Sequence, residues 1–395
     1  MFDFATVHGD PQPPRFRLIV RDAASVRQLL LRPDPLALAE AYIEGRLDVE
    51  GDLYAALALK PYLEKQRLSA TERARLLLTV AGLPRTRSRD RHTNAYRGGM
   101  RHSRAHNRAA VAFHYDASNA FYALWLDAEM VYSCAYFPHE GMDLDSAQRA
   151  KLDYICRKLR LRPGERLLDI GCGWGGLLRW AVQHYGVTAH GVTLSQEQFA
   201  FNQTRIRELG LSDRMSVELR DYRDLTGEGL YDKIVSVGMF EHVGLRQLPA
   251  YFAAAHRLLK NDGLFLNHGI THTDEGWQRD GVNAEFINRY VFPDAELECV
   301  SRIQLAMERA GFEIVDVEQL RRHYAETLRH WVARLEARQG EALQHVSPAT
   351  YRVWRLYMAA CALEFEEGGA GLYQILLTKR STPRSTPRTR AHLYV

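Results

Sequence analysis

The sequence contains few cysteines and no long apolar run, and each absence excludes a class of protein. Its five cysteines are odd in number and scattered, which favours a reduced cytoplasm over a disulfide framework. No Cys/His cluster has the spacing of a zinc site, so we predict no metal. No stretch approaches 18 uninterrupted apolar residues, and residues 1–10 lack the basic and apolar parts of a signal peptide. We therefore expect a cytoplasmic protein without a transmembrane helix.

The length and composition of the chain predict two domains. At 395 residues it exceeds one average domain, and 46% apolar residues suffice for a full core. The formal net charge of +4 is small, so its distribution matters more than its sum. We expect a small, mostly helical N-terminal domain over residues 1–83, a basic linker over 84–108, a large domain over 109–380 and a disordered tail over 381–395.

One glycine-rich stretch predicts a nucleotide site in the large domain. An apolar run ends in Asp169, and Gly171 and Gly173 then begin a G-x-G-x-x-G turn before an amphipathic segment. Such a strand, turn and helix bring backbone N–H groups close to a ligand. A dinucleotide site would place an acid after the next strand, but residues 191–195 contain none. With a later acid at Asp221, the pattern resembles the S-adenosylmethionine (SAM) site of class I methyltransferases.

Strands and helices alternate after this turn, which predicts the fold. The expected strands lie near 185–192, 214–219, 233–237 and 264–268, with helices over 196–209 and 248–259 between them. This alternation predicts a parallel, doubly wound α/β sheet of the class I SAM-methyltransferase (Rossmann-like) type, with ligands at the strand C-terminal ends. Residues 312–320 and 372–378 could supply the last strands, after an insertion over 269–301 and a helical stretch over 323–366.

The basic segment 84–108 has two readings. It holds eight arginines and one acid, Asp90. It is either a solvated linker or a surface for anionic lipid headgroups, where each cation contributes ~1 kcal/mol. Nucleic acid is disfavoured because Tyr96 is the segment's only aromatic residue.

An aromatic-rich stretch over residues 113–137 follows the basic segment. Its rings are mixed with His, Asp and Asn, which is unusual for an exposed loop. The stretch is either a helix that packs its aromatic face on the core, or a lid that covers SAM and lines an acyl channel.

Polar residues near the strand tips are candidates for chemistry. Glu241, His242 and His268 follow predicted strands, and Cys134 and Tyr324 lie in predicted loops. A single carboxylate there could cap a helix, and a single histidine could be a satisfied core residue. Their shared position at the ligand edge of the sheet favours a functional role.

Seven motifs carry a resemblance to a known family. The chain closely resembles the cyclopropane-fatty-acyl-phospholipid synthases (mycolic acid cyclopropane synthase-like) over about residues 113–380, and more loosely over the N-terminal domain. The motifs begin at His114 (HYDxxN), Tyr132 (YSCAY), Leu168 (LDIGCGWGG), Gly191 (GVTLS), Arg220 (RDYRDL), Val235 (VSVGMFEHVG) and Asn288 (NRYVFP).

The resemblance implies an activity and a set of site residues. The family adds a methylene from SAM across the cis double bond of an unsaturated acyl chain in a membrane phospholipid, with bound bicarbonate as proton acceptor. The implied bicarbonate site comprises Cys134, Glu241, His268, Ile270 and Tyr324. The implied SAM contacts are Tyr132, Ser133, Asp169, Gly171, Gly173, Thr193, Gln198 and Asp221. Cys134 is then a ligand position and not a nucleophile, because the reaction needs no covalent enzyme intermediate.

Other functions remain open at this point. Relatives of the same fold stop at methylation and make methyl-branched or methoxylated chains, and plant alkaloid N-methyltransferases share the fold. A different class is a lipid-binding protein with a catalytically dead SAM fold, which the intact glycines, Asp169 and Glu241 disfavour. We expect peripheral association with the inner face of the cytoplasmic membrane, no nucleic acid partner, and a homodimer whose two membrane-facing patches add avidity.

Overall fold

The computed structural model describes residues 14–22, 27, 34–59, 118–273, 282–292, 296–380 and 386–394. The basic segment 84–108 and residues 60–83 of the expected N-terminal domain lie outside these ranges. The predicted domain boundaries therefore stay predictions. In the described ranges, every helix is too short or too polar to cross a bilayer.

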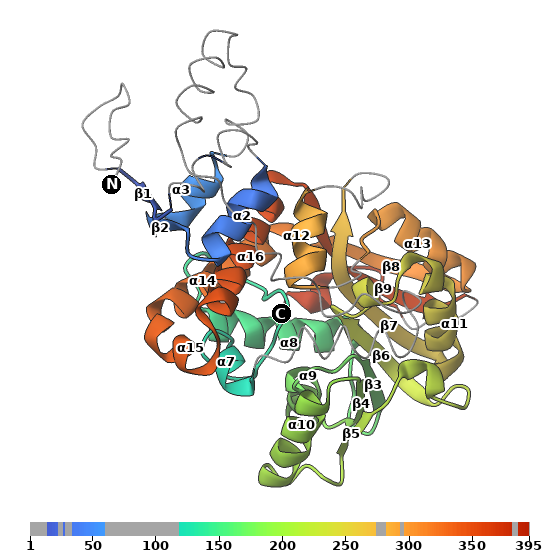
Figure 1. Cartoon of the computed structure of the whole chain (residues 1–395). Helices are drawn as coiled ribbons and strands as arrows, with labels where there is room; N and C mark the ends of the chain where they lie inside the picture. The colour runs from blue at the N-terminus through green and yellow to red at the C-terminus, as the bar shows by residue number, and fades with distance from the viewer. Residues whose placement is uncertain are drawn as a thin grey trace.

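A seven-stranded sheet forms the centre of the large domain (Figure 1). Its strands lie side by side in the order β5-β4-β3-β6-β7-β9-β8. In chain order they are β3 (Arg166–Ile170), β4 (Thr188–Thr193), β5 (Met215–Leu219), β6 (Tyr231–Val237), β7 (Leu259–His272), β8 (Phe312–Gln319) and β9 (Ala370–Lys379). The strands from β5 to β7 are mutually parallel, as the alternation of strands and helices predicts.

The far edge of the sheet differs from the all-parallel arrangement that we predicted. Strand β9 runs antiparallel to both β7 and β8. The helices between β8 and β9 leave and return at the same edge: the Leu320 amide donates to the Leu372 carbonyl over 2.8 Å, and the Arg321 guanidinium donates to the Glu366 carbonyl over 2.8 Å. Because β9 starts beside the end of β8, β9 must run antiparallel to β8.

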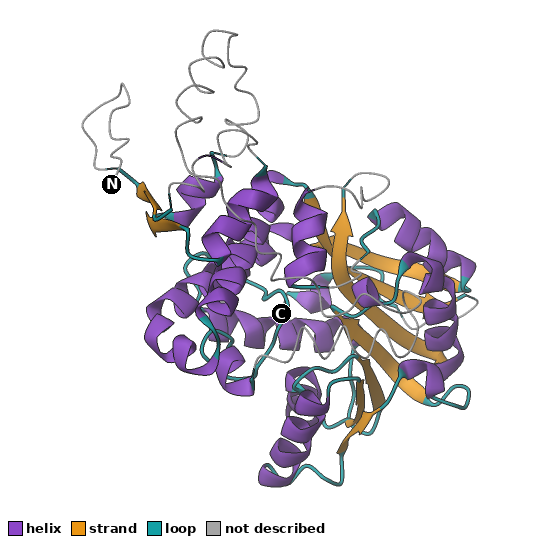
Figure 2. Ribbon diagram, in the orientation of Figure 1, coloured by secondary structure: helices purple, strands orange, loops and turns teal. Residues whose placement is uncertain are grey.

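Helices cover both faces of the sheet (Figure 2). Alternating strand side chains point to opposite faces, so Leu167 packs in one apolar cluster and Leu168 in another. The first face is covered mainly by α8 (Leu144–Leu159), α9 (Gly176–Tyr185) and α10 (Gln196–Glu208). The second face is covered by α11 (Leu248–Leu258) and α13 (Val300–Arg309). These helices agree with the predicted alternation.

A third apolar cluster joins the remaining helices beside the sheet. In the region expected to be helical, these are α14 (Arg321–Ala337), α15 (Gln339–His345) and α16 (Pro348–Glu367). The short α7 (Asn119–Ala123) and the insertion helix α12 (Val282–Tyr290) complete this layer, which also receives α2 (Pro35–Ile43) and α3 (Leu53–Leu57) from the N-terminal region.

The described part of the N-terminal region packs against the helical layer. Its strands β1 (Phe16–Val20) and β2 (Leu47–Gly51) pair antiparallel, and α2 begins at Pro35. The Arg352 guanidinium on α16 donates to the Tyr42 carbonyl over 2.8 Å and pairs with Asp48 at 2.9 Å. This region is therefore fixed to the helical layer by α16.

The C-terminal segment differs from the expected disordered tail over residues 386–394. It ends in the 3₁₀ helix η4 (Ala391–Leu393), whose Leu393 side chain is buried. Arg390 donates to Asp316 over 2.6 Å, and Arg157 on α8 donates to the Leu393 carbonyl over 2.5 Å. One buried leucine and two arginine contacts hold this segment, although its polar repeat predicted none of them.

Candidate active site

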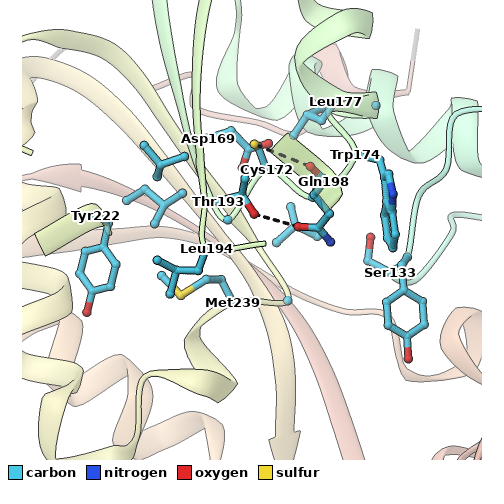
Figure 3. Close-up of a pocket in the computed structure, with 18 of the residues that line it drawn as sticks. Ser133, Asp169, Cys172, Trp174, Leu177, Thr193, Leu194, Gln198, Tyr222 and Met239 are labelled. Atoms are coloured by element: carbon cyan, nitrogen blue, oxygen red, sulfur yellow. Dashed lines mark hydrogen bonds between the residues drawn. The ribbon is translucent and has the colours of Figure 1, made fainter. Parts of the chain in front are cut away.

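A pocket opens at the C-terminal ends of β3, β4 and β6 (Figure 3). Parallel sheets bind ligands at this edge because loops and helix N-termini gather there. All eight residues that we predicted as SAM contacts line it: Tyr132, Ser133, Asp169, Gly171, Gly173, Thr193, Gln198 and Asp221. The structure thus brings the whole predicted set to one cavity.

The glycine turn shapes the floor of this pocket. Gly171, Gly173 and Gly175 have φ values of +85°, +53° and +76°, which side chains rarely adopt. A Cβ atom on Gly173 would meet no atom within 4 Å, so it would extend into open space at the pocket. A Cβ atom on Gly175 would lie 2.0 Å from Asn202 Oδ1. Besides the three glycines of the G-x-G-x-x-G motif, the turn thus needs a fourth, at 175, that we did not single out from the sequence.

Asp169, the last residue but one of β3, is a buried acid, and its Oδ1 has no hydrogen-bond partner in the part of the chain that the structure describes. Burial raises the pKa of this carboxyl to about 7, and the positive charge of Lys151 opposes that rise. A buried acceptor left unsatisfied by the protein is usually paired by a ligand or water. Asp169 therefore fits a contact to the polar groups of SAM.

Two further predicted contacts hold the end of β4 in place. The Thr193 hydroxyl donates to Gln198 Oε1 over 2.8 Å, across the turn into α10 (Figure 3). Asp221, after β5, accepts from the Arg223 side chain at 2.9 Å and from its amide at 3.0 Å. The Asp221 carboxylate thus keeps its charge paired at the rim of the pocket.

Lys151 is a pocket residue that we did not predict from the sequence. Its side chain on α8 is 1% exposed, and Nζ donates to Ser133 Oγ over 2.9 Å. Gln148, one turn earlier, donates to the Ser133 carbonyl over 2.8 Å, so α8 fixes the predicted loop at two points. The sequence pattern could have indicated that Lys151 is buried, because this residue falls on the buried face of an amphipathic helix, one turn after Ala147 and adjacent to Leu152.

The aromatic stretch packs mainly on the core, as the first of its two predicted readings has it, and one of its rings lines the pocket. Phe121, Tyr122 and Trp125 are fully buried and pack as core residues on α14 and α16. The Trp125 ring lies 5.5 Å from Tyr132, and Tyr122 lies 5.0 Å from Trp174. Since Tyr132 and Trp174 line the pocket, the aromatic cluster forms one of its walls.

Glu241 and Ile270 are in direct contact beside this pocket. Glu241 lies in the 3₁₀ helix η2 (Phe240–His242) after β6, and its Oε1 accepts from the Ile270 amide over 2.8 Å. Its Oε2 is buried and has no hydrogen-bond partner among the described residues. Burial raises the pKa of this carboxyl to about 7, so the acid is close to its midpoint at neutral pH.

His268 points from the same strand as Ile270, two residues earlier and hence on the same face. Its Nδ1 lies 3.1 Å from Gln374 Nε2 on β9, which faces it in the strand register. Its Nε2 is buried without a partner in the described ranges. Burial lowers the pKa of this imidazole well below its ordinary value, so the ring is neutral at pH 7.

Cys134 and Tyr324 meet at the carbonyl of Leu320. The thiol contacts this oxygen at 3.8 Å, and the Tyr324 amide donates to it over 3.1 Å. Tyr324 lies in the first turn of α14, which agrees with the helical stretch expected over 323–366 and not with the loop in which we also placed this residue. Burial raises the pKa of the Cys134 thiol well above its ordinary value, which agrees with a ligand position and disfavours a nucleophile.

Comparison with known proteins identifies the family. A family model described as mycolic acid cyclopropane synthetase matches residues 102–375. The chain belongs to this family. A probable fatty acid methyltransferase of Pseudomonas putida is 41% identical over 384 residues, covering 96% of this chain and 92% of the relative. The cyclopropane-fatty-acyl-phospholipid synthase of Escherichia coli (strain K12) is 36% identical over 352 residues, covering 89% and 85%.

Solved structures agree with this assignment. Mycolic acid cyclopropane synthase CmaA1, complexed with SAH and CTAB, is 36% identical and has a TM-score of 0.65, covering 69% of this chain and 98% of that one. Membership of the mycolic acid cyclopropane synthetase family confirms the predicted resemblance, the class I methyltransferase fold and a SAM-dependent enzyme of the cyclopropane synthase type. The roles of individual site residues stay predictions.

Proposed function

We propose that this protein is a cyclopropane-fatty-acyl-phospholipid synthase, which adds a methylene from SAM to the cis double bond of an unsaturated acyl chain in a membrane phospholipid. One observation supports this choice most: Glu241 Oε2 and His268 Nε2 are buried and unpartnered among the described residues, beside the predicted SAM pocket. Ring closure requires a proton acceptor near the transferred carbon, and simple binding of SAM does not.

Some residues of the pocket would bind the cofactor, and others would stabilise charge on the substrate. When bound, SAM supplies the methyl group and bicarbonate accepts the proton. Asp169 and the glycine turn would hold the cofactor, since a buried acceptor without a partner in the described ranges and open backbone line the pocket. The Tyr132 ring, 5.3 Å from Trp331, would stabilise the positive charge that methylation leaves on the acyl chain.

The polar groups beside the SAM pocket fit a small anion such as bicarbonate. Neutral His268 and the protonated form of Glu241 can each donate a hydrogen bond from an atom that has no partner among the described residues. Glu241 is itself held by the Ile270 amide, so its second oxygen has a fixed direction. These residues would orient the proton acceptor, and the dry surroundings would exclude water from the cation.

The same proposal includes a phospholipid substrate and association of the enzyme with the membrane. The insertion helix α12 precedes Phe292, whose ring lies 5.2 Å from His242, and His242 lines the SAM pocket. The acyl chain would enter near this insertion while the cytoplasmic enzyme rests on the inner face of the membrane. Phe286 is buried in the helical layer, so Tyr290 and Phe292, both half-buried, are the better candidates for contact with lipid. We also propose a homodimer, which would present two such faces.

Expression in a host that makes unsaturated phospholipids tests this function. The expected product is an acyl chain 14 mass units heavier that has lost its alkene. The Glu241→Gln variant, made at the same level, is the matched control and should leave the alkene intact. A heavier chain that keeps a double bond would instead support methyl branching, the activity closer to the name of the Pseudomonas putida relative. An unchanged fatty acid profile would contradict both.

A further inference from the structure

The hydrogen-bonding role of His268 depends on which of its ring nitrogens carries the proton. Burial and the positive charges of Lys151 and Lys158 lower the pKa of this imidazole well below its ordinary value, so the ring is neutral at pH 7. A neutral imidazole has one N–H donor, and its other nitrogen is an acceptor. Nε2 is buried and has no partner among the described residues. It can donate to an anionic oxygen only if it carries the proton, so the partner of Nδ1 determines whether His268 can bind an anion.

Gln374 on β9 is the partner of this Nδ1 atom. The amide nitrogen Nε2 of Gln374 lies 3.1 Å from His268 Nδ1, and the two residues are directly opposite in the antiparallel pairing of β7 and β9. Both side chains are buried, with 1% of His268 and 0% of Gln374 exposed, so bulk water does not reach this contact. A side-chain amide nitrogen can only donate, which makes Nδ1 the acceptor and leaves the proton on Nε2 of the ring.

The neighbouring strand β8 explains why the Gln374 amide nitrogen is directed toward His268. Glu318 lies opposite Gln374 in the pairing of β8 and β9, and its carboxylate would be the strongest competing acceptor. Both of its oxygens are already paired with side chains of α8: Lys158 Nζ donates to Oε2 over 2.5 Å, and the Tyr154 hydroxyl donates to Oε1 over 3.2 Å. With this carboxylate occupied, the imidazole nitrogen is the acceptor that the Gln374 amide reaches.

We propose that Gln374 is a positioning residue of the predicted anion site: its amide donates to His268 Nδ1 and thereby keeps the proton on Nε2, which can then donate to the bicarbonate anion. This role rests on the proposed function. Gln374 does not line the SAM pocket in the described part of the chain, so it acts through the ring of His268. The reversed amide, with Oε1 toward the ring, would place the proton on Nδ1 and leave no donor for the anion on Nε2.

The tautomer of His268 can be measured directly, without cofactor or anion. In the full-length protein labelled with ¹⁵N at histidine, protonated and unprotonated ring nitrogens give separate NMR signals. The His268→Gln variant identifies the signals of this ring by their loss. At neutral pH we expect the protonated signal from Nε2 and the unprotonated signal from Nδ1. A proton found on Nδ1 alone in the parent protein would overturn the role of Gln374, whatever reaction the enzyme catalyses.

Variants of Gln374 test whether its amide sets this tautomer. Gln374→Met has a similar length but no donor, so neither tautomer is held and the two ¹⁵N signals should move toward each other. Affinity for ¹³C-labelled bicarbonate, measured by NMR on the protein loaded with S-adenosylhomocysteine, should fall several-fold, because part of the protein then holds the tautomer that cannot donate. SAM affinity, measured by calorimetry, should stay that of the parent. Gln374→Leu serves as the second variant if the methionine protein does not fold.

A matched control and the parent protein complete this test. Gln319→Met changes an exposed glutamine on β8 and should leave the tautomer and both affinities unchanged. Parent-like signals and bicarbonate affinity in a folded Gln374 variant would overturn the role of Gln374 alone. A parent protein that shows the expected tautomer but neither binds nor requires bicarbonate would overturn the proposed proton acceptor, and the role of Gln374 in binding it.

Discussion

Replacing Glu241 with glutamine should make the stability of the protein less dependent on pH. The carboxyl is 6% exposed, and burial raises its pKa from its ordinary value of 4.5 to about 7. Between these two values the folded protein holds a proton that the unfolded chain has released. The stability that this bound proton contributes is complete below pH 4.5 and is lost as the pH rises through 7.

The size of the effect follows from the shift in pKa. At 1.36 kcal/mol per pKa unit, the buried acid costs the folded protein about 3 kcal/mol above pH 7. Glutamine has the shape of the protonated acid, and its oxygen can still accept from the Ile270 amide. Relative to the parent, Glu241→Gln should therefore gain about 3 kcal/mol in the free energy of unfolding between pH 4.5 and pH 8.

Urea unfolding of both proteins at these two pH values, without cofactor, measures this gain. Glu313→Gln on β8, where the side chain is exposed, is the matched control and should follow the parent. The same Glu241→Gln protein should bind SAM normally but turn over at least ~100-fold more slowly. A variant whose stability depends on pH as the parent's does would refute the burial argument, and near-normal turnover would remove Glu241 from the catalytic set.

Three further predictions concern cofactor, membrane and tail. Gly173→Ala and Asp169→Ala should each abolish SAM binding, because the first fills the space at the turn and the second removes an acceptor that has no partner among the described residues; unchanged calorimetric affinity in both would contradict the predicted position of the cofactor. Leu393→Ala should lower the free energy of unfolding by about 2 kcal/mol, since the side chain is buried; an unchanged melting temperature would show that the C-terminal contact is weak. Binding to anionic vesicles should fall as salt rises. Changing four arginines of the basic segment 84–108 to serine should reduce this binding and leave SAM affinity intact. If this variant sediments with vesicles at low salt as well as the parent does, the segment is only a linker. The four arginines are Arg85, Arg87, Arg89 and Arg91.

Local patterns predicted the parts of the fold that depend on neighbouring residues. The strand, turn and helix around Asp169 could be predicted because glycines and apolar spacing act within a few residues. The direction of β9 could not, because it depends on where three intervening helices return to the sheet. The C-terminal contact of Leu393 also joins residues far apart in the chain, and its polar neighbours gave no sign of it.

The site shows the same division between local and distant information. Motif resemblance named the predicted SAM contacts, and the structure gathers these residues in one pocket. Lys151 was missed because a lysine in a helix usually faces solvent, and only the packing of α8 on the Ser133 loop shows that it is buried. The helical stretch was expected to start at residue 323, and α14 starts at Arg321 because the preceding residue, Leu320, is hydrogen-bonded to Leu372 of β9.

The position of the transferred carbon tests the proposed function most directly. Purified protein is incubated with SAM labelled with ¹³C at the methyl group and vesicles of an unsaturated phospholipid, and the recovered acyl chains are examined by NMR. Ring closure predicts that the label appears in a cyclopropane methylene, with loss of the alkene signals and no label in the Glu241→Gln control. Label found only in a methyl group on the chain would contradict cyclopropane synthesis by this protein.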